Sequence, residues 1–276
     1  QIILPGATPS MAMGWLLFGF GERQPNGTVQ ILALSGYTPP PILERIARRA
    51  QLVGRRPEEV TLVAVSKYQP LERIQELYAL GQRAFAENRV QSLLERREAL
   101  PMPDIRWHLI GHLQRNKARM VVPFAAMIHS VDDLALAREL EHRMTLALQA
   151  EAGAAGSRQG NPKLPVLLQV NISEEGQKQG ARPEELEELV TAILTTCPHL
   201  ELRGLMGMAS NESDLERTRP QFRALRECRD RIQERHPELT GFTELSMGMS
   251  NDFEVAIEEG ATIVRLGSVL FQDPDA

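Results

Sequence analysis

The chain has 276 residues, of which 42% are hydrophobic, 24% charged and 5% aromatic, a composition that is ordinary for a globular protein and excludes collagen-like and disordered chains. This length fits either one large α/β domain or two smaller domains. A single domain is possible because α/β barrels often reach about 250 residues. The formal net charge of -5 argues against a general nucleic-acid binder, which normally carries a basic face, and favours a small molecule as the partner.

The two cysteines and the apolar segments bear on the compartment. Cys197 and Cys228 are far apart and lack metal-binding spacing, so they indicate neither a disulfide framework nor a zinc site and fit a reducing cytosol. The longest apolar stretch, residues 11–20, is too short for a bilayer, which needs about 20 residues. It also lacks the basic segment that precedes it in a signal peptide. We therefore expect a cytoplasmic protein with no membrane anchor.

Residues 1–40 differ from the rest of the chain. They are rich in Gly, Pro and Thr, end in a proline run at 39–41, and show no sustained period of 2 or 3.6 residues. A short hairpin fits inside them. We expect residues 1–40 to form an N-terminal extension outside the domain, and residues 41–276 to form the domain itself.

After residue 41, short apolar or β-branched runs alternate with longer amphipathic runs, which is typical of repeated βα units. The predicted strands are Thr61–Ser66, Ala84–Glu87, Trp107–Gly111, Met127–Val131, Val166–Ile172, Arg203–Ala209, Glu244–Met247 and Ile263–Leu266. The predicted helices are Ile42–Val53, Leu71–Leu80, Arg89–Ala99, Gln114–Val121, Asp133–Ala150, Pro183–Thr195, Asp214–Glu234 and Asp252–Glu259. Residues 152–161 are predicted to be a flexible, solvated loop.

Eight strands separated by helices predict a single closed (β/α)8 barrel, of the TIM type, preceded by an extra N-terminal helix. An open, doubly wound sheet is the alternative. It is disfavoured because the glycine-rich dinucleotide fingerprint of that fold is absent after the first strand, where Lys67 and Pro70 stand instead.

The active sites of such barrels lie at the C-terminal ends of the strands. Lys67 follows the first strand and, by the period of 2, shares a face with Val63 and Val65. If this face points inward, the amine enters the barrel mouth, where a desolvated lysine can form an imine with an aldehyde. A surface lysine at a strand end is the alternative interpretation.

The last two strands predict an anion site. Arg265 shares a face with Ile263 and Gly267, and a guanidinium inside a barrel requires an acceptor from a ligand or from the protein. Gly267 and Ser268 then offer a close backbone approach and a hydroxyl. The preceding strand leads through Ser246 to Ser250 and Asn251, one of which is expected to cap the next helix. These two loops are predicted to converge on one phosphate.

Other polar residues at strand ends are weaker signals. Asn88 follows the second strand, while His108 and His129 lie in the third and fourth. Because these histidines lack the spacing and carboxylate company of a metal site, we interpret them as core histidines with satisfied hydrogen bonds and not as ligands.

Several motifs, in this order, resemble those of the pyridoxal 5'-phosphate (PLP) homeostasis proteins, the YggS/PROSC family, over residues 42–272. They are Leu62 to Lys67, Glu87 to Gln91, Trp107 to Lys117, Gln169 to Ile172, Gly204 to Met206, Leu245 to Ser250 and Val264 to Ser268. The resemblance implies a fold-type III PLP-binding barrel. One departure is Gln69, where many members carry a second lysine.

The resemblance also implies roles for individual residues. PLP would be bound as a Schiff base on Lys67, with its pyridine nitrogen facing Arg265 and Asn88 beside its ring. Its phosphate would lie on the region formed by Ser246, Ser250, Gly267 and Ser268. No metal is implied.

The function implied is that of a PLP carrier or regulator in vitamin B6 and amino-acid homeostasis, without turnover of its own and as a monomer. A PLP-dependent racemase of the alanine-racemase type is the first alternative. It is disfavoured because the chain ends at Ala276, soon after the last strand, which leaves no room for the C-terminal β-domain of those enzymes. The second alternative is a barrel enzyme that uses Lys67 as an aldolase-type amine on a phosphorylated metabolite.

Overall fold

The computed structural model describes residues 21–23, 29–31, 40–151, 163–173, 179–212 and 214–271. The apolar stretch at 11–20 and the predicted loop at 152–161 lie outside these ranges. Within residues 1–40, the strands β1 (Gly21–Arg23) and β2 (Val29–Ile31) pair antiparallel, with Gly21 opposite Ile31. This pairing is the short hairpin for which the sequence leaves room.

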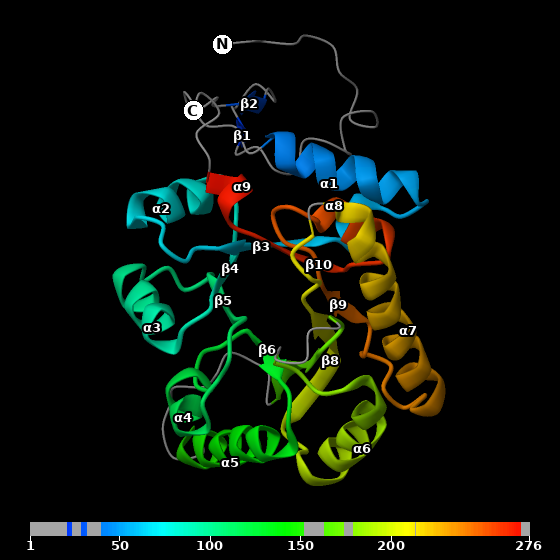
Figure 1. Cartoon of the computed structure of the whole chain (residues 1–276). Helices are drawn as coiled ribbons and strands as arrows, with labels where there is room; N and C mark the ends of the chain where they lie inside the picture. Colours follow the sequence, from blue (N-terminus) through cyan, green and yellow to red (C-terminus); the bar gives the residue numbers. More distant parts are fainter. Residues whose placement is uncertain are drawn as a thin grey trace.

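The remaining strands close into a parallel barrel in the order β10-β3-β4-β5-β6-β7-β8-β9, shown in Figure 1. Their bounds are β3 (Thr61–Val65), β4 (Ala84–Glu87), β5 (Arg106–Leu109), β6 (Met127–Val131), β7 (Leu164–Val170), β8 (Leu200–Gly207), β9 (Glu244–Ser246) and β10 (Ile263–Leu266). The barrel is closed by β10 and β3, which pair from Ile263 opposite Thr61 to Leu266 opposite Ala64. The predicted (β/α)8 barrel is confirmed, and the open sheet is excluded.

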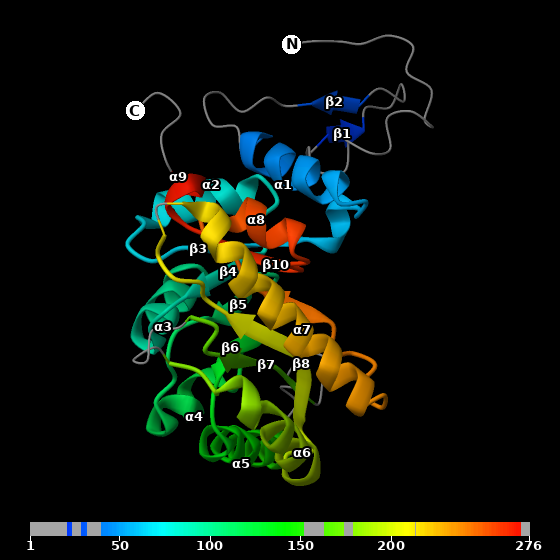
Figure 2. The ribbon, with the colours of Figure 1, turned by 45° about the vertical axis from the view of Figure 1, so that its right-hand side comes forward.

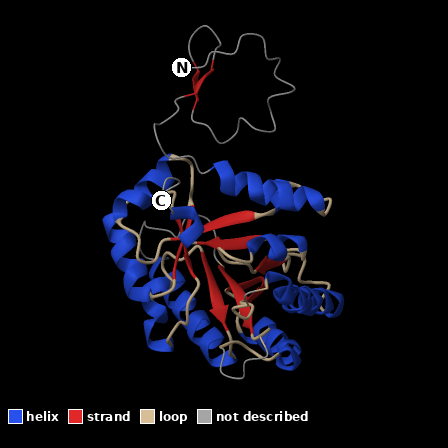
Figure 3. Cartoon of the chain, turned by 45° about the horizontal axis from the view of Figure 1, so that its top comes forward, coloured by secondary structure: helices blue, strands red, loops and turns tan. Residues whose placement is uncertain are grey.

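Helices surround the strands, as Figures 2 and 3 show from two further directions. They are α1 (Pro40–Leu52), α2 (Leu71–Ala79), α3 (Val90–Ala99), α4 (Ala118–Val121), α5 (Leu134–Glu151), α6 (Leu186–Thr196), α7 (Arg219–Arg235), α8 (Phe253–Glu258) and α9 (Ser268–Phe271). Short 3-10 turns lie at η1 (Pro57–Glu59), η2 (Arg115–Lys117), η3 (Pro183–Glu185) and η4 (Leu215–Thr218). Three of the predicted helices therefore begin as 3-10 turns, and α9 was not predicted.

The outer core lies between the strands and the helices. Helix α6 shows why it docks there, because its buried residues Leu186, Leu189, Val190 and Ile193 recur at helical spacing and form one apolar face. The same cluster includes Ala64 and Val264 from the strands. Within the described part of the chain, every helix is too short or too polar to cross a lipid bilayer.

A second, smaller core fills the inside of the barrel. It consists of Val63, Ala84, Ala86, Met127, Leu167, Met206 and Ile263. Because side chains alternate along a strand, Val63 points inward where Ala64 points outward, and Ile263 points inward where Val264 points outward. Arg265, two residues after Ile263, shares the inward face, as the sequence predicted.

Helix α1 is fixed to the barrel through α8. Arg45 Nε lies 2.9 Å from Glu254 Oε1, and Arg49 Nη1 lies 2.9 Å from Glu258 Oε1. Ile42, Ile46 and Ala50 are buried on the same helix. Helix α1 therefore packs as part of the barrel unit.

Candidate functional site

Lys67 stands at the C-terminal end of β3. The three residues before it, Ala64, Val65 and Ser66, are buried, whereas Lys67 itself is exposed. Its amine forms no hydrogen bond or ion pair with the residues that the structure describes. The chain turns sharply just after it, since Tyr68 has a φ of 65°, a left-handed conformation that is uncommon outside glycine. The strand thus delivers an unpaired primary amine to the barrel mouth.

The neighbouring strand β4 ends in a buried carboxylate, Glu87. Its Oε1 accepts a hydrogen bond of 2.8 Å from the Ser66 hydroxyl, and Arg96 Nε lies 3.8 Å away. Its Oε2 is buried and has no partner among the described residues. Burial raises the pKa of Glu87, although the Ser66 hydrogen bond and the positive charges of Arg96 and Lys67 oppose this shift. A buried acceptor therefore lies close to Lys67.

Asn88, which follows Glu87, lies against the backbone of Gly111, two residues after the end of β5. A Cβ added at Gly111 would lie 2.0 Å from the Asn88 carbonyl oxygen, so a side chain cannot be accommodated there. The Gly111 carbonyl in turn accepts a 2.7 Å hydrogen bond from Ser130 Oγ. Asn88 is half-buried, and its position depends on this contact between strand ends.

Arg265 is a cation inside the barrel, with only 3% of its surface exposed. Its Nη1 donates to Ser246 Oγ at 2.8 Å, and its Nη2 donates to the Gly207 carbonyl at 3.1 Å. Burial lowers its pKa to about 10, an effect that the charge of Asp252 partly offsets. The guanidinium is therefore still charged at neutral pH, and it forms no ion pair with the described residues.

Two buried histidines continue the hydrogen bonding from Ser246. His129 Nδ1 lies 2.9 Å from Ser246 Oγ, and His129 Nε2 lies 2.9 Å from His108 Nδ1. Burial lowers the pKa of His108 to about 3 and that of His129 well below its ordinary value, with nearby positive charges adding to both shifts. Both rings are therefore neutral. Both are core histidines, as predicted. The prediction of satisfied hydrogen bonds is wrong for His108, whose Nε2 is buried and lacks a partner among the described residues.

Ser250 joins the two loops that were predicted to converge. Its Oγ accepts hydrogen bonds from the amides of Gly267 at 3.2 Å and Val269 at 3.4 Å. The hydroxyl of Ser250 thus lies at the start of α9, beside the exposed Ser268. The two loops meet, and their convergence on a phosphate stays a prediction. The expected cap of the helix after β9 is wrong. The N-cap of α8 is Asp252, without a side-chain capping bond.

Ser246 does not join this group. It is fully buried, and its hydroxyl bonds to Arg265 and His129 and to no other described residue. Gly267 lies close to β3, since a Cβ added at Gly267 would be 3.4 Å from the Val65 carbonyl oxygen. The end of β10 therefore lies beside the end of β3, next to Lys67.

A pocket of about 350 Å³ opens beside Lys67. Its lining comes from the ends of β3 and β4 and from α2 and α3, and consists of Lys67, Tyr68, Leu71, Glu87, Asn88, Arg89, Ser92, Glu95, Arg96 and Ala99. In the described part of the chain, no cluster of histidine, cysteine or acidic side chains is suited to a metal ion.

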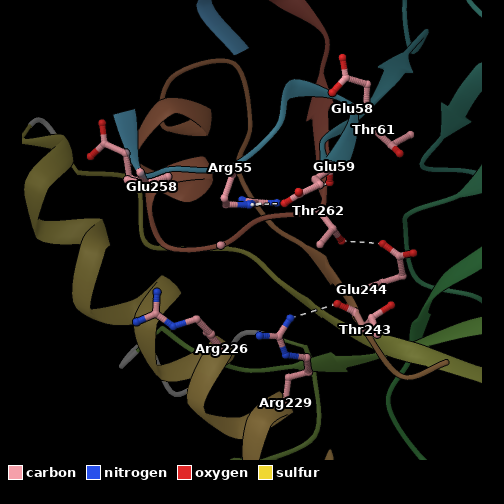
Figure 4. Close-up of a pocket in the computed structure, with 12 residues that line it drawn as sticks. Arg55, Glu58, Glu59, Thr61, Arg226, Arg229, Thr243, Glu244, Glu258 and Thr262 are labelled. Atoms are coloured by element: carbon pink, nitrogen blue, oxygen red, sulfur yellow. Dashed lines mark hydrogen bonds and ion pairs between the residues drawn. The ribbon is translucent and has the colours of Figure 1, made fainter. Parts of the chain in front are cut away.

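A larger hollow, about 760 Å³, lies at the opposite end of the barrel. Figure 4 shows its lining, with Arg226 and Arg229 of α7 on one side and Glu244 on the other. The arginines are already paired, since Arg226 Nη1 lies 3.0 Å from Glu259 Oε2 and Arg229 Nη1 donates to the Thr243 carbonyl at 3.0 Å. Barrel enzymes bind their ligands at the other end, so we interpret this hollow as structural.

Comparisons with known proteins bear on the family and the fold of this chain. Residues 42–274 match the family model described as the N-terminal domain of alanine racemase. The pyridoxal phosphate homeostasis protein of Aquifex aeolicus is 40% identical over 230 residues, which cover 83% of this chain and 94% of that protein.

Two solved structures are also similar. PipY of Synechococcus elongatus PCC7942 with PLP bound has a TM-score of 0.67 and 38% identity, over 82% of this chain and 100% of that one. Alanine racemase of Clostridium difficile 630 has a TM-score of 0.59 and 15% identity, over 83% of this chain and 56% of that one. At this identity the second likeness shows a shared fold alone.

Proposed function

The chain belongs to the family of pyridoxal phosphate homeostasis proteins, and on that premise we propose that it carries PLP on Lys67 and buffers the cofactor in intracellular vitamin B6 and amino-acid homeostasis. The observation that carries the proposal is the unpaired amine of Lys67 at the C-terminal end of β3, beside β10, whose Arg265 is a buried cation inside the barrel. The solved relative PipY, with PLP bound, supports it.

The residues present fit three groups of PLP, which are its aldehyde, its ring nitrogen and its phosphate. When bound, PLP supplies an aldehyde that forms a Schiff base with a primary amine, and Lys67 is the exposed amine at the mouth. Arg265 can only donate hydrogen bonds, so it suits an acceptor such as an unprotonated ring nitrogen. Ser250, Gly267 and Ser268 are the residues that we assign to the phosphate, and Asn88 is assigned a place beside the ring.

One residue is assigned differently from what the resemblance implies. The resemblance groups Ser246 with the phosphate, but its hydroxyl bonds to Arg265 Nη1 at 2.8 Å. We therefore assign Ser246 to the orientation of Arg265 and not to the phosphate.

A carrier role without turnover is preferred to the racemase alternative. The curated relatives are named for homeostasis and not for a reaction, and the likeness to alanine racemases concerns the fold. The two cysteines are free and buried, which supports a reducing, cytoplasmic setting. We also propose that the protein acts as a monomer.

The test is an absorbance spectrum of PLP-loaded protein before and after borohydride, with peptide mapping of the modified lysine. We expect a yellow protein, modified at Lys67. K67A should lose the absorbance band while unfolding cooperatively, and K117A, which removes another exposed lysine, should keep it. A K67A protein that remains yellow and is trapped on a different lysine would overturn the assignment. A protein that never takes up PLP would favour the aldolase-type alternative.

A further inference from the structure

A continuous row of hydrogen bonds crosses the inside of the barrel and ends on Arg265. It runs from His108 through His129 to Ser246, with spacings of 2.9, 2.9 and 2.8 Å along the row. These residues come from β5, β6, β9 and β10, and all four are buried. His108, His129 and Ser246 are called the relay below.

Both rings are neutral, so each imidazole has one nitrogen that donates and one that accepts. The relay therefore has two possible directions. In the first, Ser246 donates to His129 Nδ1 and His129 Nε2 donates to His108 Nδ1, which places a proton on Nε2 of both rings. In the second, both rings carry the proton on Nδ1, and Ser246 accepts from both Arg265 and His129.

Counting unsatisfied groups separates the two directions. The first leaves one buried group without a partner among the described residues, the Nε2–H of His108. The second leaves two such groups. One is the unprotonated Nε2 of His108, and the other is the hydroxyl proton of Ser246, which has no further partner in the described part of the chain. Since each unsatisfied buried group destabilises the fold, the first direction is favoured.

We propose that His108, His129 and Ser246 are positioning residues, a relay with both imidazoles protonated on Nε2, which turns the lone pairs of Ser246 toward Arg265 and fixes the edge that the guanidinium presents to its ligand. A hydroxyl that donates to His129 is polarised and becomes a better acceptor for Arg265. Because the relay is neutral, it orients the guanidinium of Arg265 and leaves its positive charge intact. A carboxylate in the same place would cancel that charge. The Gly207 carbonyl fixes the second nitrogen, Nη2.

The first test uses the PLP-free wild-type protein and so does not depend on the proposed function. Long-range ¹H–¹⁵N NMR spectra distinguish a protonated from a bare imidazole nitrogen, and H108Q and H129N assign the two rings. We expect both residues to be protonated on Nε2. Protonation on Nδ1 of either ring, or a mixture of the two forms, would overturn the relay.

The second test, which rests on the proposed function, compares H129N with H129L. Both variants remove the ring and leave a similar cavity, but the asparagine oxygen can still accept from Ser246 and leucine cannot. We expect H129N to bind PLP within about 3-fold of wild type. H129L should bind it about 10-fold more weakly, because the buried Ser246 hydroxyl then has no acceptor for its proton. Equal losses in both variants would reject the relay.

The failures of the two proposals can be told apart. If wild-type protein does not bind PLP, the proposed function is wrong while the NMR spectra still decide the relay. If H129L does not fold, the NMR spectra of the wild-type protein alone decide whether the relay is correct.

Discussion

The Ser66 hydroxyl lies 2.8 Å from Glu87 Oε1, so the residue before Lys67 is bonded to the residue before Asn88 across two neighbouring strands. Ser66 and Glu87 are both buried. The two residues assigned to the cofactor thus extend from one rigid buried contact. That contact includes a carboxylate whose pKa is raised above its ordinary value of 4.5, chiefly by burial.

The first prediction concerns this carboxylate. Because the folded-state pKa is raised, the folded protein holds a proton on Glu87 more tightly than the unfolded chain does. Glu87 therefore contributes stability below pH 4.5 that is lost as the pH rises through the folded-state pKa. E87Q stays neutral, so its stability relative to wild type should increase from acid to neutral pH.

Urea unfolding at a series of pH values measures this difference. E98Q is the matched control, since it removes the same charge from an exposed side chain of α3. A difference between E87Q and wild type that stays constant, or shrinks as the pH rises, would contradict the assigned ionisation.

The second prediction concerns Gly111. In G111A the new Cβ would meet the Asn88 carbonyl 2.0 Å away, so backbone must move, and overpacking of this kind costs roughly 1–3 kcal/mol. The displaced backbone carries Asn88 with it, so PLP affinity should fall as well. G241A is the control, because its nearest new contact is the end of Arg203 at 3.5 Å. Thermal unfolding and PLP titration of both variants check this, and equal stability of the two would refute it.

The strand positions follow from the sequence because alternation of apolar residues is a local signal. Strands β4, β6 and β10 have the predicted bounds, and the same alternation placed Arg265 on the inward face. Helix starts were less accurate, since a first turn can be 3-10 or α with the same residues.

Contacts across the barrel could not be predicted in this way. His129 and Ser246 lie on β6 and β9, which are not neighbours in the sheet, so their contact depends on the width and tilt of the closed barrel. The signal available was that both are polar residues at inward positions near strand ends. The approach of Gly111 to Asn88 is likewise a tertiary contact, for which glycine alone was the signal.

The third prediction concerns the domain boundary. We propose that the PLP-binding unit is residues 41–276 and that residues 1–40 lie outside it. Deleting residues 1–39 should leave PLP binding and the unfolding temperature unchanged, because α1 begins at Pro40. Deleting residues 1–52 removes α1 with its buried Ile42 and Ile46 and its ion pairs to α8. The free energy of unfolding should then fall by about 1–3 kcal/mol and the unfolding temperature by several degrees. Similar losses in both truncations would place the boundary elsewhere.

The last prediction links Arg265 to the absence of turnover. Its guanidinium has a pKa of about 10, so at neutral pH it carries donors and no acceptor, and a ring nitrogen that faces it must accept and stay unprotonated. PLP enzymes that use the ring as an electron sink keep that nitrogen protonated by an acidic partner, and Arg265 forms no ion pair with the described residues. The buried histidines do not supply a base at the mouth. Three of their four ring nitrogens bond to Ser246 or to each other, and the fourth, His108 Nε2, is buried inside the barrel. PLP-loaded protein incubated with L-alanine in deuterium oxide should therefore show negligible racemisation and α-proton exchange, measured by chiral chromatography and NMR. Turnover of about 1 per second or more, a rate typical of dedicated enzymes, would reject the carrier function and establish the racemase alternative in its place.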